Sequence, residues 1–72
     1  MPESVYKVIE LVGTSPDSWE KAAAAAVEVA AKSLKDLRIA EIADLDMHIG
    51  EDGRVVAYRA KVKISFKYRT GD

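Results

Sequence analysis

The sequence predicts an α+β domain in which one strand precedes a single helix and two further strands follow it, in the order β-α-β-β. Three observations support this prediction. An apolar segment at residues 5–12 runs directly into a helix-start signal, an alanine-rich segment repeats its apolar residues at helical spacing, and an alternating segment near the end follows a glycine-bounded turn. Each pattern is typical of one element type, because side chains repeat every 3.6 residues in a helix and every two in a strand.

The first strand is expected at residues 5–12, where apolar side chains occur on both sides of an extended chain. The two sets are Val5, Ile9 and Leu11 on one side and Tyr6, Val8 and Val12 on the other. Such a strand needs cover on both faces, and a chain of 72 residues has little material to supply it. We therefore expect the protein to associate with copies of itself.

A single helix is expected from Pro16 to about Leu37. Ser15 is a suitable N-cap, Pro16 suits the first helical position, and Asp17 lies near the positive end of the helix dipole. Apolar residues then recur at spacings of three and four, at Trp19, Ala23, Ala26, Ala30, Leu34 and Leu37. The alanine run Ala22–Ala26 leaves so little side chain that this helix can approach a sheet or another helix closely.

Two further strands are expected at residues 38–49 and 54–69, joined as an antiparallel hairpin by the turn Gly50–Gly53. The last strand alternates, with one side formed by Val56, Tyr58, Ala60, Val62, Ile64, Phe66 and Tyr68 and the other by Arg59, Lys61, Lys63, Ser65, Lys67 and Arg69. Unbroken, it would extend roughly 50 Å at about 3.3 Å per residue, which is longer than one short helix can cover. The surplus apolar surface predicts a large subunit interface.

Composition places the chain among globular proteins with one domain, residues 1–72. Hydrophobic residues make up 49% and charged residues 32% of the chain, a balance that excludes a disordered protein. The net charge of −1 gives no support to binding of nucleic acid or of an anionic membrane surface. The lack of cysteine excludes disulfides and thiolate chemistry. With neither a signal peptide nor a membrane-spanning segment recognised, a cytoplasmic location is expected.

Catalysis is not expected from the residues present. Among the polar side chains, the serines at positions 15, 18, 33 and 65 have no base partner except His48, the sole histidine. The sequence also has no glycine-rich phosphate-binding loop. We therefore expect a binding or structural protein, not an enzyme.

Acidic residues on the second expected strand indicate a cation site. Asp44, Asp46 and His48 alternate, so their side chains point to one face with neighbours about 6.5–7 Å apart. Each carboxylate can supply a ligand to a hard cation that prefers six to eight oxygens, although symmetry mates, backbone carbonyls or water must complete the shell. The alternative is structural: Asp44 can lie opposite Arg59 across the hairpin and form an ion pair. The sequence leaves both interpretations open.

The order of elements and several local sequences together resemble the dodecin family. The similar segments span nearly the whole chain and comprise residues 5–15, the alanine-rich helix, and residues 37–42, 58–59 and 62–66. The resemblance implies a three-stranded antiparallel sheet partly wrapped around one helix. It further implies a hollow homododecamer, closed by trimeric and twofold contacts, that stores a small ligand, typically a flavin.

At the ligand positions that the resemblance implies, this chain departs from flavin-binding dodecins. Those proteins carry a tryptophan that stacks on the flavin ring, where this chain has Ile39, two positions before the family's Glu41. They also carry a glutamine that bonds the edge of the flavin, where this chain has Arg59, whose side chain has donors only. A further acceptor position corresponds approximately to His48. Because both signature groups are missing, tight flavin binding is not expected.

The segment Thr14–Glu20 looks more like a branch of the family that binds calcium and also lacks the stacking tryptophan. We interpret Trp19 itself as a residue that closes the core or a subunit contact. The expected function is therefore that of a dodecin-like homododecamer that stores or buffers a cation such as calcium, with Asp44 and Asp46 as candidate ligands. The alternatives are storage of a flavin (riboflavin or FMN) and a purely structural assembly.

Overall fold

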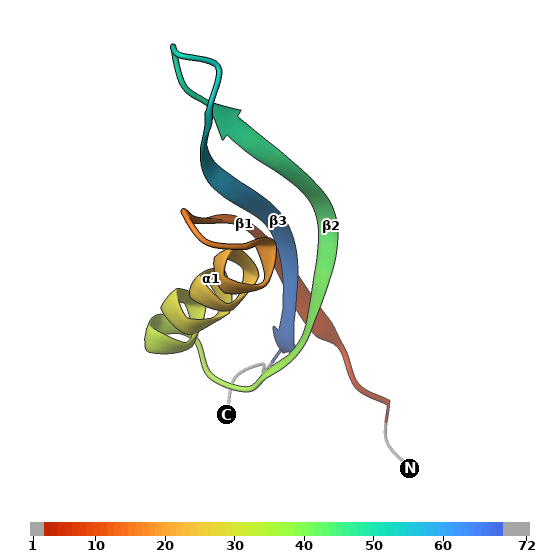
Figure 1. Cartoon of the computed structure of the whole chain (residues 1–72). Helices are drawn as coiled ribbons and strands as arrows, with labels where there is room; N and C mark the ends of the chain where they lie inside the picture. The colour runs from red at the N-terminus through yellow and green to blue at the C-terminus, as the bar shows by residue number, and fades with distance from the viewer. Residues whose placement is uncertain (1–2, 69–72) are drawn as a thin grey trace.

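A computed structural model describes residues 3–68 and shows a three-stranded antiparallel sheet packed against a single helix (Figure 1). The elements in chain order are β1 (Tyr6–Ser15), α1 (Trp19–Ser33), β2 (Leu37–Ile49) and β3 (Val55–Lys67). The sheet order β1-β3-β2 puts the last strand in the centre, where it pairs with both others. The predicted fold class, element order and hairpin are thus confirmed.

The helix is shorter at both ends than the sequence predicted, and its N-cap is Ser18 instead of Ser15. The Ser15 hydroxyl accepts hydrogen bonds from the backbone N–H groups of Asp17 (3.0 Å) and Ser18 (3.4 Å), which turns the chain before the helix begins. The Ser18 hydroxyl then accepts from the N–H of Lys21 at 3.0 Å. Ser15 therefore ends β1, and Pro16 lies in the turn.

At its other end, α1 stops at Ser33 because the chain becomes extended at Leu34, whose N–H still donates to the Ala30 carbonyl at 2.9 Å. Leu37 consequently belongs to β2 and not to the helix. At the end of the chain, β3 stops at Lys67, and the predicted continuation to Arg69 lies outside the described residues.

The core lies between α1 and the neighbouring strands β1 and β3. Its fully buried members come from one face of the helix and the centre of β3: Ala22, Ala26, Ala30, Ala60, Val62 and Ile64. Small helix side chains let α1 approach β1 so closely that a Cβ at Gly13 would overlap the Ala22 carbonyl oxygen. The predicted close approach of the alanine-rich helix is therefore confirmed.

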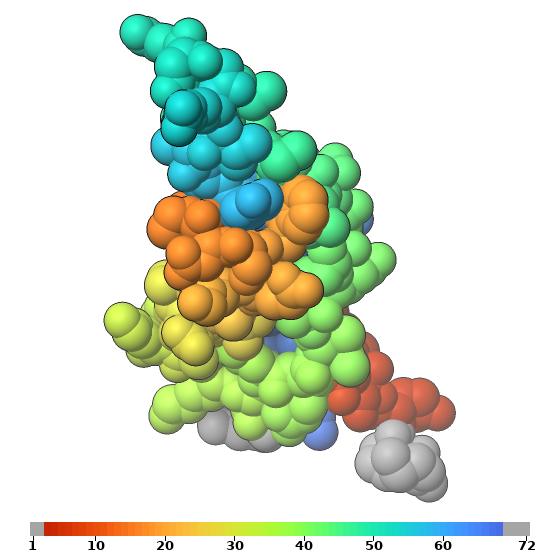
Figure 2. All heavy atoms as spheres, viewed as in Figure 1, coloured from red at the N-terminus to blue at the C-terminus, as the bar shows by residue number. Residues whose placement is uncertain are grey.

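The hairpin of β2 and β3 extends well beyond the helix, and its tip stands clear of the body of the subunit (Figure 2). The turn is closed by the Gly50 N–H, which donates to the Arg54 carbonyl at 2.8 Å. It includes Gly53 at φ 82°, a left-handed conformation that favours glycine. The result is an elongated subunit with extents of 55 × 20 × 15 Å.

Strand β2 has almost no helix beneath it, because α1 covers β1 and β3. Every residue of β2 beyond Leu37 is exposed, including the apolar residues Ile39, Ile42, Leu45, Met47 and Ile49. On β1, Val8 and Val12 are exposed on the face turned away from the helix. These strands thus carry apolar side chains that one subunit leaves in contact with water.

Candidate functional site

The face of the sheet turned away from α1, here called the open face, carries all the candidate site residues. Strand register assigns the following residues to it: Tyr6, Val8, Glu10, Val12 and Thr14 from β1, Ile39, Glu41, Asp44, Asp46 and His48 from β2, and Ala57, Arg59, Lys61, Lys63, Ser65 and Lys67 from β3. Basic residues occupy the central strand, and acidic residues flank them. The open face is therefore a set of charged rows with apolar residues among them.

An irregularity in β2 brings two groups of candidate residues to the same face. Glu41 lies opposite Lys63 and Ile42 opposite Val62, after which the register shifts so that Asp44 lies opposite Lys61. A shift of this kind is a β-bulge, which adds one unpaired residue and re-aims the side chains that follow. In a regular strand, Asp44 would share the face of Ile42. With the bulge, it shares the face of Glu41.

Asp46 and Arg59 form a bidentate ion pair in the half of the hairpin nearer the turn. The Arg59 Nε donates to Asp46 Oδ1 at 2.7 Å, and its Nη2 donates to Asp46 Oδ2 at 2.9 Å. This parallel geometry is the strongest arrangement that an arginine and a carboxylate adopt. A cross-strand ion pair of Arg59 was predicted with Asp44; that assignment is wrong, because Asp46 is the residue opposite Arg59 in the register.

The pair keeps both groups charged. Hydrogen bonds from Arg59, together with its charge and that of Lys61, hold the pKa of the Asp46 carboxyl below its ordinary value. In return, the hydrogen bond and charge of Asp46 raise the pKa of the Arg59 guanidinium. At neutral pH the carboxylate is ionised, and both its oxygens are engaged by the guanidinium.

Trp19 fixes the backbone at the same place. Its indole Nε1–H donates to the backbone carbonyl of Asp46 at 3.0 Å, and its ring meets that of Tyr58 edge-on, with centroids 5.1 Å apart. The first turn of α1 is thereby joined to both strands of the hairpin beside Arg59. The Trp19–Asp46 contact spans 27 positions, and no local pattern in the sequence pointed to it.

Asp44 differs from Asp46 in having no lysine or arginine partner among residues 3–68. Its Oδ1 accepts the N–H of Leu45 at 3.0 Å, and Lys61 lies opposite it in the register. Within residues 3–68, no lysine or arginine nitrogen lies within 4.0 Å of its carboxylate. No group of three or more histidine or acidic side chains in this part of the chain is arranged to hold a metal ion. A cation site that used Asp44 would need ligands from elsewhere.

The four positions that the family resemblance implied share the open face but lie far apart on one subunit. Ile39 and Glu41 lie near the start of β2, where they are opposite Ser65 and Lys63. Arg59 lies nearer the hairpin turn, opposite Asp46. His48 lies nine residues from Ile39, a separation of about 30 Å along an extended strand. One subunit therefore does not gather these residues around a common cavity.

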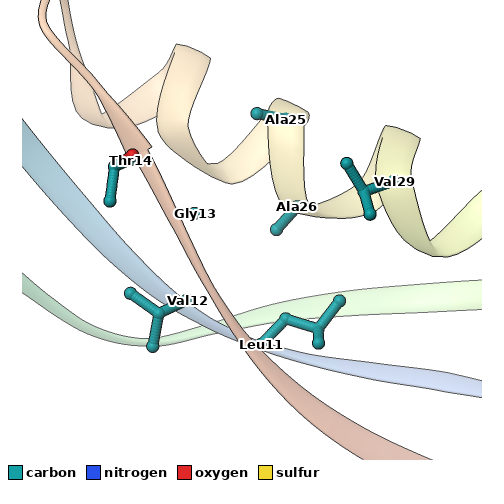
Figure 3. A pocket seen from close by; sticks show the side chains of 7 residues that line it. All are labelled: Leu11, Val12, Gly13, Thr14, Ala25, Ala26 and Val29. Atoms are coloured by element: carbon teal, nitrogen blue, oxygen red, sulfur yellow. The ribbon is translucent and has the colours of Figure 1, made fainter.

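Two shallow hollows occur elsewhere on the subunit. One, of about 180 Å³, lies beneath the start of β2 and is bordered by Ile39 together with Val27, Leu37, Arg38, Ala40 and Ile64. The other, of about 270 Å³, lies between β1 and α1 and is lined by Leu11, Val12, Gly13, Thr14, Ala25, Ala26 and Val29 (Figure 3). Both linings are largely apolar. Neither brings together the ionisable side chains that a catalytic centre or a cation site needs.

Comparison with known proteins identifies the family of the chain. Its β-α-β-β fold leaves one face of the sheet and most of β2 without cover. The dodecin family model matches residues 5–69, and the chain belongs to the dodecin family.

Two relatives come from different bacteria. The calcium dodecin of Mycobacterium tuberculosis is 50% identical over 66 residues, which are 92% of each chain. A dodecin of Thermus thermophilus is 40% identical over 63 residues, covering 88% of this chain and 90% of that one.

Solved structures agree in fold over nearly the whole chain. The crystal structure of calcium dodecin from M. tuberculosis, described as a calcium-chelating antigen with a novel calcium-binding site, superposes with a TM-score of 0.82 at 48% identity and covers 96% of this chain and 97% of its own. The dodecin of Streptomyces coelicolor gives a TM-score of 0.89 at 34% identity, with 99% and 100% covered. In the part of the chain that the structure describes, no helix is long and apolar enough to cross a membrane.

Proposed function

We propose that this protein is a non-enzymatic dodecin that assembles into a homododecamer and binds calcium, which it stores or buffers. The observation that carries the proposal is the 50% identity, over 92% of both chains, to a protein called calcium dodecin. The segment Thr14–Glu20 and the replacement of both flavin-contacting groups, at Ile39 and Arg59, support calcium over flavin as the ligand.

The shape of the subunit supports assembly. Its radius of gyration is 15.0 Å, whereas a compact domain of this length has one of about 11 Å. Its exposed surface is 5558 Å², against about 4,400 Å² for a compact monomer of the same mass. The exposed apolar side chains of β2 contribute to this excess. Neighbouring subunits would cover these side chains and could also bring ligands to one another's open faces.

The candidate cation ligands are Asp44 and Asp46. Asp44 is exposed and has one oxygen bonded only to a backbone N–H, so it can ligate a hard cation without losing an ion pair. Asp46 is ionised but held by Arg59. Because calcium takes six to eight oxygens, two carboxylates of one chain are too few. We infer that copies of the chain, backbone carbonyls and water complete the shell.

Flavin storage has less support from the side chains present. Ile39 offers no ring on which a flavin could stack, and it is exposed on the open face. Arg59 has no acceptor atom, and its Nε and Nη2 donors already bond Asp46. The position occupied by a hydrogen-bonding amide in flavin-binding dodecins is thus engaged in an ion pair here.

The test is calcium titration of the assembled protein by calorimetry, with native mass spectrometry to count subunits and bound ions. We expect discrete calcium ions on an intact particle, and we expect Asp44→Asn to weaken calcium binding by about tenfold, because charged ligands set affinity. Glu28→Gln is the matched control: it also removes one exposed carboxylate, but from α1 and far from the open face. Its affinity should equal that of the parent.

Other outcomes would decide against parts of the proposal. If Asp44→Asn and Asp46→Asn both bind calcium like the parent, the site is elsewhere. An intact particle that takes up no calcium would favour a purely structural assembly. A particle that binds riboflavin or FMN tightly and takes up no calcium would favour flavin storage.

A further inference from the structure

The two carboxylates of the candidate cation site differ in a way that the similarity to calcium dodecin does not explain. Asp46 has both oxygens bonded by one guanidinium, at 2.7 and 2.9 Å, whereas Asp44 accepts a single backbone N–H at 3.0 Å. They are two positions apart on the same face of β2. A cation that reaches this face therefore meets one available carboxylate and one that already has a positively charged partner.

The position of Asp46 does not depend on Arg59 alone. Its backbone carbonyl accepts the Trp19 indole N–H, and the edge-on contact of Trp19 with Tyr58 fixes the strand opposite. The backbone that carries the Asp46 carboxylate is therefore held independently of Arg59. The Arg59 side chain is 46% exposed, so its guanidinium can leave the carboxylate and enter water without moving either strand.

We propose that Arg59 is an internal competitor of the bound cation: its guanidinium occupies Asp46, and calcium gains this second carboxylate only by displacing it. Arg59 then lowers the affinity of the site for any cation. It also makes the site selective for divalent cations, because a monovalent cation attracts the carboxylate too weakly to displace an arginine. The inference rests on the proposed calcium function, and it assigns Arg59 a regulating role at that site.

The direction of the effect follows from charge and ligand count. Without the guanidinium, the open face would have one positive charge fewer beside the cation and one carboxylate more to offer it. Calcium affinity rises with the number of charged ligands available. We expect Arg59→Gln to bind calcium at least about tenfold more tightly than the parent.

The experiment measures calcium affinity of the assembled protein by calorimetry for the parent, for Arg59→Gln and for three further variants. Arg59→Lys keeps the charge but cannot form two parallel bonds, and it should bind with an affinity between those of the parent and Arg59→Gln. Asp46→Asn combined with Arg59→Gln should lose the gain. Arg54→Gln is the matched control, because it removes an arginine whose weak pair with Asp52, at 3.9 Å, lies in the turn. Its affinity should not change.

The outcomes separate this inference from the proposed function. Calcium binding by the parent with no gain, or a loss, in Arg59→Gln would overturn the inference and leave the proposed function in place. Binding by Arg59→Gln but not by the parent would support the inference and contradict calcium storage by the natural protein. Absence of binding in every variant would contradict both. An equal gain in Arg54→Gln would show a general effect of net charge and overturn the role of Arg59.

Discussion

At the scale of single residues, Ile39 occupies the position at which the family resemblance implies the flavin-stacking tryptophan. It lies on the open face of β2 and is 65% exposed, so a larger side chain there would not disturb the core. The family resemblance implies that an indole at this position stacks on the flavin ring. Such stacking contributes about 0.5–1.5 kcal/mol beyond buried area.

We therefore expect Ile39→Trp to raise flavin affinity by about tenfold, measured as quenching of flavin fluorescence. Ile49→Trp is the matched control, since Ile49 is 63% exposed on the same strand but lies next to the hairpin turn. Equal quenching by both variants would indicate nonspecific stacking. No quenching by Ile39→Trp would mean that the Asp46–Arg59 pair or the shape of the open face also prevents flavin binding. Quenching by Ile39→Trp combined with Arg59→Gln would then identify the ion pair as the cause.

The ion pair shows how far the sequence could specify the site. An ion pair between Arg59 and an aspartate of β2 was predictable from alternating patterns on the two strands. The partner was not, because counting back from the turn pairs Ile49 with residue 54 and reaches Asp44. In the structure, Ile49 lies opposite Val55 and the register shifts again before His48, so Arg59 meets Asp46. Irregularities of one residue beside a turn leave no clear sequence signal, yet each changes every partner that follows.

At the scale of elements, the contact between α1 and β1 depends on Gly13. This residue lies inside β1, opposite the fully buried Ala60, and the backbone of the helix passes directly over it. The sequence predicted the first strand for residues 5–12 and the helix from Pro16, which left Gly13 outside both elements. Its role became visible only when the strand proved to continue to Ser15.

We expect Gly13→Ala to destabilise the protein by about 1–3 kcal/mol, because the new methyl group would overlap the Ala22 carbonyl oxygen and lie 3.2 Å from the Ala26 Cβ. The helix would have to move away from the sheet, since neither neighbour is a flexible side chain. Thermal unfolding followed by circular dichroism should show the midpoint lowered by roughly 4–8 °C per kcal/mol.

Gly53→Ala is the control for the general effect of replacing a glycine. A Cβ at Gly53 has open space around it, and only the left-handed φ of 82° opposes the substitution. It should cost about 1 kcal/mol. If Gly13→Ala proved no more harmful than Gly53→Ala, the helix would not be held against β1 as closely as the structure shows.

At the scale of the whole molecule, the chain uses its apolar residues in two ways. Those of α1 and the centre of β3 form a small core, whose fully buried side chains are three alanines of the helix with Ala60, Val62 and Ile64. Those of β2 beyond Leu37 are exposed in the single chain. The sequence predicted a surplus of apolar surface on the last strand, but the centre of β3 is covered, and β2 exposes more large apolar side chains than β3 does. Strand order decides this, because it places β3 in the middle of the sheet, and order was not readable from the alternating patterns.

The exposed apolar side chains of β2 lead to a prediction about assembly. Native mass spectrometry should show a particle of twelve chains, each of 7.9 kDa, or about 95 kDa in total. Leu45→Asp should reduce the particle to smaller species, because Leu45 is exposed on β2 in the isolated subunit, on the same side of the sheet as α1. Burial of the exposed part of Leu45 against a neighbouring subunit contributes about 1 kcal/mol to association at each interface. Burial of an unpaired carboxylate at the same position costs several kcal/mol.

The fold of the subunit itself should survive this substitution, since the position has little cover within one chain. Circular dichroism of Leu45→Asp should therefore keep the helix and sheet signals of the parent while the particle falls apart. Lys32→Asp is the control, because it introduces the same carboxylate at an exposed polar position of α1, and its particle should stay intact. A monomeric parent would contradict assembly, and an intact Leu45→Asp particle would show that the apolar strand β2 faces solvent or the interior of the shell and not a neighbouring subunit.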